Sequence, residues 1–232
     1  MRNYRKLTGL FTAALLTFGT LTGCTSSQDK QAISDTATAF LSIVASDSTE
    51  DITNYATTEV AEGDFVKLFD ADYLAEQIVS ETEGIELTNE SKEKVDEFCG
   101  LYSDMIQSYS ISDVNFEEGN NNKATCLATI KTKFDVNITD SDTVSEKINQ
   151  ATENYNTENA EEIAKLSEED PDAANAQVFN DMLILILNVY EEEIASSEEM
   201  TYAMVLTLEK NTETDSWIVT NVEDYDSSDM GN

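Results

Sequence analysis

The stretch KATCLATIKTKFDVNI, residues 123–138, decides the fold class because its apolar and polar residues alternate. Successive side chains of a β-strand point to opposite faces of the sheet, so this pattern predicts a strand with one dry face and one wet face. Such a strand is typical of an antiparallel sheet that is covered on one side only. The residues on the predicted dry face are Ala124, Cys126, Ala128, Ile130, Phe134, Val136 and Ile138, and those on the wet face include Thr125, Lys131, Lys133 and Asp135.

Three more segments have the composition of strands and complete two hairpins. YSISDVNFE (109–117) precedes the first strand and is joined to it by the turn-rich EGNNN. TYAMVLTLEK (201–210) and WIVTNV (217–222) follow much later, around the polar turn NTETDS. The sequence therefore predicts a four-stranded antiparallel sheet.

Helical periodicity dominates the chain before the first hairpin. Residues 29–46 form an amphipathic helix with the apolar stripe Ile33, Ala37, Phe40, Leu41 and Val44. Shorter helical pieces with Phe65, Leu68, Phe69, Leu74 and Ile78 come next. A further helix is predicted at about 90–108, with Thr88 as its N-cap.

A long helical insertion separates the two hairpins at about 140–197. Thr143 and Glu146 fit a capping box at the start of its first helix. Asp170 and Pro171 supply an N-cap and a first-turn proline for its second helix, at about 172–196. The apolar run MLILILNVY (182–190) has the composition of a buried strand or of a buried helix, and the cap before it favours the helix. The fold class is therefore α+β, with helices packed on one face of the sheet.

The amino terminus is organised as a bacterial lipoprotein leader. MRNYRK is basic, and residues 7–20 are apolar or neutral but too few for a membrane span, which needs about 20 apolar residues. Leu21-Thr22-Gly23-Cys24 resembles the lipobox, in which the chain is cut before a cysteine that carries a diacylglycerol. The resemblance implies a signal peptide at 1–23 and an extracytoplasmic protein that Cys24 attaches to the cell membrane, with palmitate as an expected acyl chain. A tether at 24–28, a single domain at 29–224 and a disordered tail at 225–232 complete the predicted organisation.

The net charge excludes nucleic acid as a partner. The full chain has 13 basic and 47 acidic residues; three of the basic ones precede Cys24, which leaves ten lysines, no arginine and a formal charge of −37. Such a chain has no electrostatic footprint for nucleic acid. Loose, non-specific binding of divalent cations is expected instead. Lys123, Lys131 and Lys133 gather on one strand, where they either pair with acids of neighbouring strands or form a docking patch for an acidic wall polymer.

Residue types limit the chemistry. The chain has no histidine, which excludes Ser-His-Asp and Cys-His catalysis and imidazole metal sites. Asp135 to Glu146 partly imitates a calcium loop, but Asp140 stands where that loop needs glycine, so a strand end followed by a helix cap is the better interpretation. We therefore predict no catalytic residue, no specific metal site and no cofactor.

Two cysteines remain after Cys24, in a compartment that permits disulfides. Cys99 and Cys126 both lie on predicted apolar faces. The sequence is compatible with a Cys99–Cys126 disulfide or with two buried free thiols, and favours the thiols slightly. A thiol without a nearby histidine or arginine is a weak nucleophile, so packing in the core is the expected role of both residues.

The order of elements and a last strand led by Trp217 resemble the cystatin-like cone of the nuclear-transport-factor-2-like superfamily, including lipobox lipoproteins of Gram-positive bacteria. The resemblance implies N-terminal helices across a curved sheet and an apolar pocket between them, with Tyr109, Phe134, Tyr202 and Met204 as candidate lining. We expect a non-enzymatic module that binds a small ligand or an envelope partner. The alternatives are an enzyme that uses a pocket carboxylate and tyrosines as acid and base, and a structural spacer.

Overall fold

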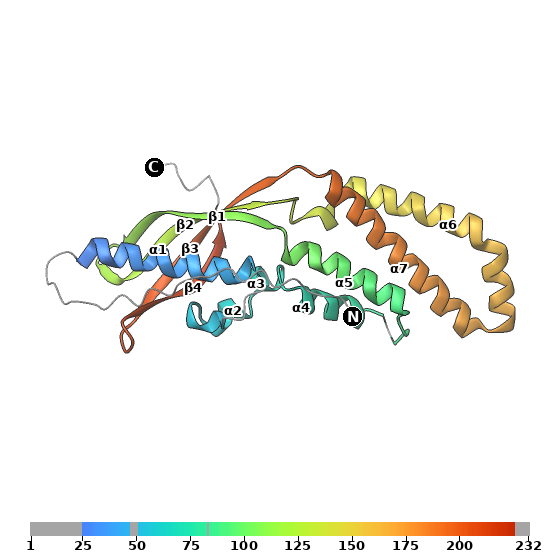
Figure 1. Ribbon diagram of the computed structural model, residues 1–232, viewed down its shortest axis with the longest axis horizontal. Helices are drawn as coiled ribbons and strands as arrows, with labels where there is room; N and C mark the ends of the chain where they lie inside the picture. Colours follow the sequence, from blue (N-terminus) through green and yellow to red (C-terminus); the bar gives the residue numbers. More distant parts are fainter. Residues whose placement is uncertain (1–24, 47–50, 83, 226–232) are drawn as a thin grey trace, which may run out of the picture.

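The computed structural model describes residues 25–46, 51–82 and 84–225, and within them the predicted α+β fold is confirmed (Figure 1). A single antiparallel sheet with the strand order β1-β2-β3-β4 forms its centre. Helices α1 to α5 precede the sheet, and helices α6 and α7 are inserted between its two hairpins. The predicted signal peptide, Cys24 and residues 226–232 lie outside the described residues.

The strands are β1 (Ile106–Glu117), β2 (Asn120–Thr132), β3 (Met200–Asn211) and β4 (Ser216–Asp224). The alternation on β2 is confirmed over the strand itself, where Ala124, Cys126, Ala128 and Ile130 are all buried. The predicted hairpin of β1 with β2 is confirmed, and along its other edge β2 pairs with β3, which joins the two hairpins into one sheet.

The predicted end of β2 at residue 138 is wrong, because the chain leaves the sheet after Thr132. The buried Thr132 hydroxyl donates to the carbonyl oxygen of Phe134 at 2.7 Å, and the backbone N–H of Asn137 donates to the Asp135 carboxylate at 2.9 Å. These local bonds turn the backbone into a short 3₁₀ helix, η2 (Ile138–Asp140). Phe134 and Ile138 are nevertheless buried, so apolar residues at the same alternate positions continue to face the core beyond the strand.

Both hairpin turns depend on residues with positive φ. In the first, Glu117 pairs with Asn120 and Gly119 takes φ +78°. In the second, Asp215 has φ +58°, and its N–H donates to the carbonyl oxygen of Asn211 at 2.8 Å. Aspartate tolerates this conformation better than most residues, so the turn forms without a glycine.

Helix α1 (Thr25–Val44) lies across one face of the sheet, and its predicted apolar stripe is confirmed (Figure 1). Four of the five stripe residues have no exposed surface, and Val44 is 6% exposed. The helix begins at Thr25, so residues 25–28 of the segment expected as a tether form its first turn. Near this end, Lys210 of β3 forms ion pairs with Asp29 at 3.1 Å and with Asp215 at 3.0 Å.

The segment after α1 contains η1 (Ile52–Asn54), α2 (Thr58–Ala61), α3 (Asp64–Lys67) and α4 (Ala71–Ser80). Residues 55–57 of this segment pair with the free edge of β4. The N–H of Thr57 donates to the carbonyl oxygen of Val219 at 2.9 Å, and the N–H of Val219 donates to that of Tyr55 at 2.8 Å. Part of the edge of β4 is therefore hydrogen-bonded instead of open to another chain.

Helix α5 (Asn89–Ser103) begins as predicted and ends earlier. The Thr88 hydroxyl accepts from the N–H of Ser91 at 3.1 Å, which confirms the N-cap. The predicted end at residue 108 is wrong, because β1 begins at Ile106. Met105 is completely buried between the two elements, and its carbonyl oxygen accepts from the N–H of Lys133 at 2.9 Å.

Helices α6 (Asp142–Glu169) and α7 (Pro171–Ser196) form an arm that projects from the sheet, at the opposite end of the long axis from the start of α1 (Figure 1). The Asp170 cap is confirmed, since its carboxylate accepts from the N–H of Ala173 at 3.1 Å. The capping box at Thr143 is wrong: the N-cap is Ser141, and it makes no side-chain cap bond. The run 182–190 is helical, as its cap indicated.

Candidate functional site

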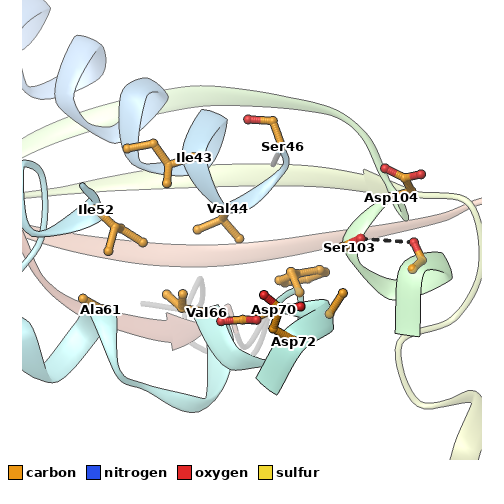
Figure 2. A pocket seen from close by; sticks show the side chains of 13 residues that line it. Ile43, Val44, Ser46, Ile52, Ala61, Val66, Asp70, Asp72, Ser103 and Asp104 are labelled. Carbon is orange, nitrogen blue, oxygen red and sulfur yellow. Dashed lines mark hydrogen bonds between the residues drawn. The ribbon is translucent and has the colours of Figure 1, made fainter. Parts of the chain in front are cut away.

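A pocket of about 660 Å³ opens where the carboxyl ends of α1 and α5 meet η1 and the α2–α4 segment (Figure 2). Its apolar lining comes from α1, η1, α2, α3 and the start of α4, and from the chain between α3 and α4. Val44 and Phe69, which are 6% and 7% exposed, are also part of the hydrophobic core. The apolar lining residues are Ile43, Val44, Ile52, Ala61, Val66, Phe69 and Ala71.

The polar lining of this pocket is acidic. Asp70 and Asp72 flank the start of α4, Asp104 follows the last turn of α5, and the side chains of all three are exposed. The Asp70 carboxylate accepts from the N–H of Tyr73 at 2.9 Å, which makes it the N-cap of α4. Ser46 and Ser103 complete the polar lining, and the Ser103 hydroxyl donates to the carbonyl oxygen of Gly100 at 3.1 Å (Figure 2). The pocket therefore combines a hydrocarbon wall with a negatively charged rim.

The four residues predicted to line a pocket lie elsewhere. Tyr109, Tyr202 and Met204 are on the core face of the sheet, and Phe134 follows β2. Phe134 and Met204 are core residues with 1% and 6% of their surface exposed. Tyr109 and Tyr202 sit on either side of Ile130 in the strand register, so the sheet does bring these two tyrosines to the same region. None of the four lines the pocket in Figure 2.

Tyr202 forms a carboxylate–tyrosine pair with Asp135. Its hydroxyl donates to the Asp135 carboxylate at 2.8 Å and accepts from the N–H of Val136 at 3.0 Å. Burial raises the pKa of Tyr202 to about 12, and the backbone N–H of Asn137 lowers the pKa of Asp135. An efficient general acid or base has a pKa near the working pH, and both shifts move away from neutrality. The pair is therefore suited to holding η2 against β3.

Cys99 and Cys126 are both buried free thiols in the structure, on α5 and β2. Burial raises the pKa of Cys99 to about 11 and that of Cys126 to about 12. Since the thiolate is the nucleophilic form, both residues are inert at neutral pH in the folded protein.

The lysines of β2 are engaged by acids. Lys123 pairs with Glu209 of the adjacent strand at 3.7 Å, and Lys131 pairs with Glu199, which immediately precedes β3. This is the arrangement of a solvated sheet face that neighbouring acids neutralise. Lys133, beyond the end of β2, is exposed.

The loop that imitates a calcium site is held by its own hydrogen bonds. Asp135 accepts from Asn137 and Tyr202, and Ser141 is the N-cap of α6. Within the described ranges, no group of three or more aspartate, glutamate or cysteine side chains is placed to hold a metal ion.

The pocket of Figure 2 was not predicted, although its residues carry local signals. Asp70 stands where a helix cap is expected, before Ala71 and the apolar residues of α4. Asp104 follows the last turn of α5, and only the tertiary fold brings it to the same pocket as Asp70. With 47 acidic residues in the chain, no sequence pattern separates these carboxylates from the rest.

Comparison with known proteins does not assign the chain to a family. No protein-family model matches the chain, and no curated protein matches it. One solved structure aligns with it: a candidate lipoprotein, ycdA, from Bacillus subtilis subsp. subtilis strain 168, with 15% sequence identity and a TM-score of 0.42. The alignment covers 84% of this chain and 54% of ycdA, so the chain spans about half the length of that protein. In the described part of the chain, none of the helices is both long enough and apolar enough to cross a membrane.

Proposed function

We propose that this protein is a lipid-anchored extracytoplasmic protein that binds a small ligand in the pocket between α1 and the α2–α5 segment. The observation that carries the anchor is Leu21-Thr22-Gly23-Cys24 at the end of a basic and then apolar leader. A diacylglyceryl group supplies two acyl chains, and two chains give stable attachment where one is marginal. The mature protein would then begin at Cys24, one residue before α1.

The pocket is what supports ligand binding. Its volume of about 660 Å³ falls within the range of about 300–1,000 Å³ that is usual for small-molecule sites. Its apolar wall would desolvate a ligand, and its few polar groups would orient it. We prefer binding to catalysis because burial raises to about 12 the pKa of both Tyr202, which donates to Asp135, and Tyr155, which donates to Asp181, so both tyrosines are shifted away from neutrality.

The position of α1 would orient the anchored protein relative to the membrane. The helix lies across the sheet and starts at one end of the long axis, while the arm of α6 and α7 extends to the other end (Figure 1). The 26 residues of α7 alone correspond to about 39 Å. Acyl chains on Cys24 would therefore hold the sheet end next to the membrane. The formal charge of −37 would keep the acidic body away from anionic lipid.

The anchor is tested by expressing the full chain in a bacterium that processes lipoproteins and separating membranes from the aqueous fraction. We expect the wild type in the membrane fraction and the Cys24→Ala variant as an uncut precursor that lacks the lipid. The matched control is Cys99→Ala, which removes a thiol of the core and is expected to leave lipidation unchanged. Equal processing of the wild type and Cys24→Ala would refute the proposal.

A further inference from the structure

The charged side chains that line the pocket would favour a cationic ligand over an anionic one. Three carboxylates, those of Asp70, Asp72 and Asp104, belong to its lining, and no lysine does. Lys67, the lysine nearest to them in the sequence, lies over the ring of Tyr73, 5.0 Å from its centroid. The rim therefore attracts cations and repels anions.

Two helix ends add to this field. The last residues of α1 and of α5 both line the pocket, and neither helix has a basic residue in its last turn. A helix carboxyl end carries the equivalent of about half a negative charge, which favours a cation close to it. The amino end of α4 opposes this effect, but its Asp70 cap supplies a full negative charge there.

The apolar wall of the pocket would favour a ligand that has an apolar part. A bare divalent cation needs several oxygen ligands around it, and within the described residues no group of three or more acidic side chains is placed to hold one. An apolar group placed against the half-buried Ile43, Ile52 and Val66 would instead gain roughly 25 cal/mol for each Å² of apolar surface removed from water. A ligand with both features, a cationic head and an apolar body, would satisfy the rim and the wall together.

We infer that this pocket binds an organic cation, with an ammonium or guanidinium group at the Asp70–Asp72–Asp104 rim and an apolar body against the wall. The inference rests on the proposed ligand-binding function and adds the chemical class of the ligand. Ligands that share an apolar body would all contact the same wall. Their affinities should therefore differ according to whether they are cationic, neutral or anionic.

The test uses three probes with one apolar body: 3-phenylpropylammonium, 3-phenylpropanol and 3-phenylpropanoate. Their binding is measured by equilibrium dialysis against the mature protein in nanodiscs of zwitterionic lipid, with empty nanodiscs as the blank. We expect the cation to bind at least about tenfold more tightly than the alcohol. Each of the three exposed carboxylates should contribute about 0.2–1 kcal/mol of attraction to the cation, and the sum corresponds to roughly this ratio of affinities. The anion should not bind, and added salt should weaken binding of the cation.

A variant with neutral rim residues identifies the site. Asp70→Asn/Asp72→Asn/Asp104→Asn removes three charges and keeps an N-cap acceptor at Asp70, because asparagine caps helices as well as aspartate does. The matched control, Glu153→Gln/Glu158→Gln/Glu161→Gln, removes three charges from exposed positions of α6. We expect the rim variant to lose the preference for the cation and still bind the alcohol, and the α6 variant to behave as the wild type. Circular dichroism checks that both variants are folded.

The outcomes separate this inference from the function on which it rests. If none of the three probes binds, the proposed ligand-binding function is wrong. If the alcohol or the anion binds as tightly as the cation, the pocket binds ligands but the assignment of an organic cation is wrong. If both triple variants weaken binding of the cation equally, the attraction comes from net charge and not from this rim, which also overturns the inference.

Discussion

Asn180 joins the arm to the rest of the molecule through a buried set of hydrogen bonds. Its side-chain oxygen accepts from the N–H of Thr88 at 2.8 Å and from the hydroxyl of Ser91 at 2.6 Å. Its side-chain nitrogen donates to the carbonyl oxygens of Glu86 and Ala176. All of its hydrogen-bonding capacity is used in a residue that is only 4% exposed.

We predict that Asn180→Ala lowers the free energy of unfolding by about 2–4 kcal/mol. The change leaves several buried donors and acceptors without partners, at a cost of about 1–3 kcal/mol each before relaxation. Urea denaturation measures the loss. Asn188→Ala, at an exposed position of the same helix, is the control and should stay within about 0.5 kcal/mol of the wild type. Equal effects of the two changes would contradict the role of Asn180.

The buried thiols give stability a defined dependence on alkaline pH. The pKa of Cys99 is raised from 9.0 to about 11 and that of Cys126 to about 12, so the unfolded chain loses these protons first. Their contribution is complete below pH 9 and is lost as the pH rises from 9 towards 11 and 12. Burial raises the pKa of Tyr102 as well, which acts in the same direction.

We predict that the urea midpoint of the wild type falls between pH 9 and pH 11, and that it falls less steeply in Cys99→Ala/Cys126→Ala. The comparison is of slopes, so the loss of packing in the variant does not affect it. A wild-type midpoint that is constant or rises over this interval would show that the thiols are not protonated and buried in the folded state.

Among the elements, the arm depends on how its two helices are joined. The C-cap of α6 and the N-cap of α7 are the same residue, Asp170, whose carboxylate holds the N–H of Ala173. Pro171 occupies the first position of α7, where a missing N–H costs nothing. The tight connection therefore folds the two helices back on each other.

We predict that Asp170→Ala destabilises the amino end of α7 by about 1 kcal/mol, the usual effect of losing an N-cap. Hydrogen exchange of the amides just after Pro171 reports this directly, and they should exchange several times faster than in the wild type. Glu169→Ala, one residue earlier at the carboxyl end of α6, is the control and should leave these amides unchanged. If both variants accelerate exchange equally, the cap does not hold the helix start.

The existence and type of the elements followed from periodicity and caps, whereas several of their ends did not. The α1 stripe, the Thr88 and Asp170 caps and the alternation on β2 are local signals, and the structure confirms them. The boundary between α5 and β1 was missed because Met105 and Ile106 continue an apolar stripe across a change of structure. The end of β2 was missed because the alternation of apolar residues continues through Phe134 and Ile138. Both residues are buried, but they lie in a loop that local hydrogen bonds stabilise.

The pocket could not be predicted for a different reason. Val44, Phe69 and Asp104 come from segments that only tertiary packing brings together. Phe134 and Met204 were predicted to line a pocket because a cone encloses space between its sheet and helices, but here both residues are packed in the core. A sequence identifies apolar faces; whether two such faces leave a space between them depends on side-chain volumes and helix angles.

For the whole molecule, the dominant physical fact is the net charge, which is −34 for the full chain and −37 for residues 24–232. Repulsion among these charges favours the expanded chain, and salt screens it. We predict that raising NaCl from about 0.02 M to about 0.5 M increases the free energy of unfolding in urea by roughly 1 kcal/mol. Glu153→Gln/Glu158→Gln/Glu161→Gln should show a smaller increase, because it carries three fewer negative charges. A decrease with salt would mean that ion pairs such as Lys210–Asp29 outweigh the repulsion.

The proposed lipid anchor would place all of these properties at the membrane surface, and mass spectrometry of the amino-terminal peptide tests it most directly. The protein is isolated from the membranes of a lipoprotein-processing bacterium, digested, and its first peptide is sequenced. We predict that this peptide begins at Cys24 and carries a diacylglyceryl group on its sulfur. A peptide that begins at any other residue, or a Cys24 with an unmodified thiol, would contradict the account.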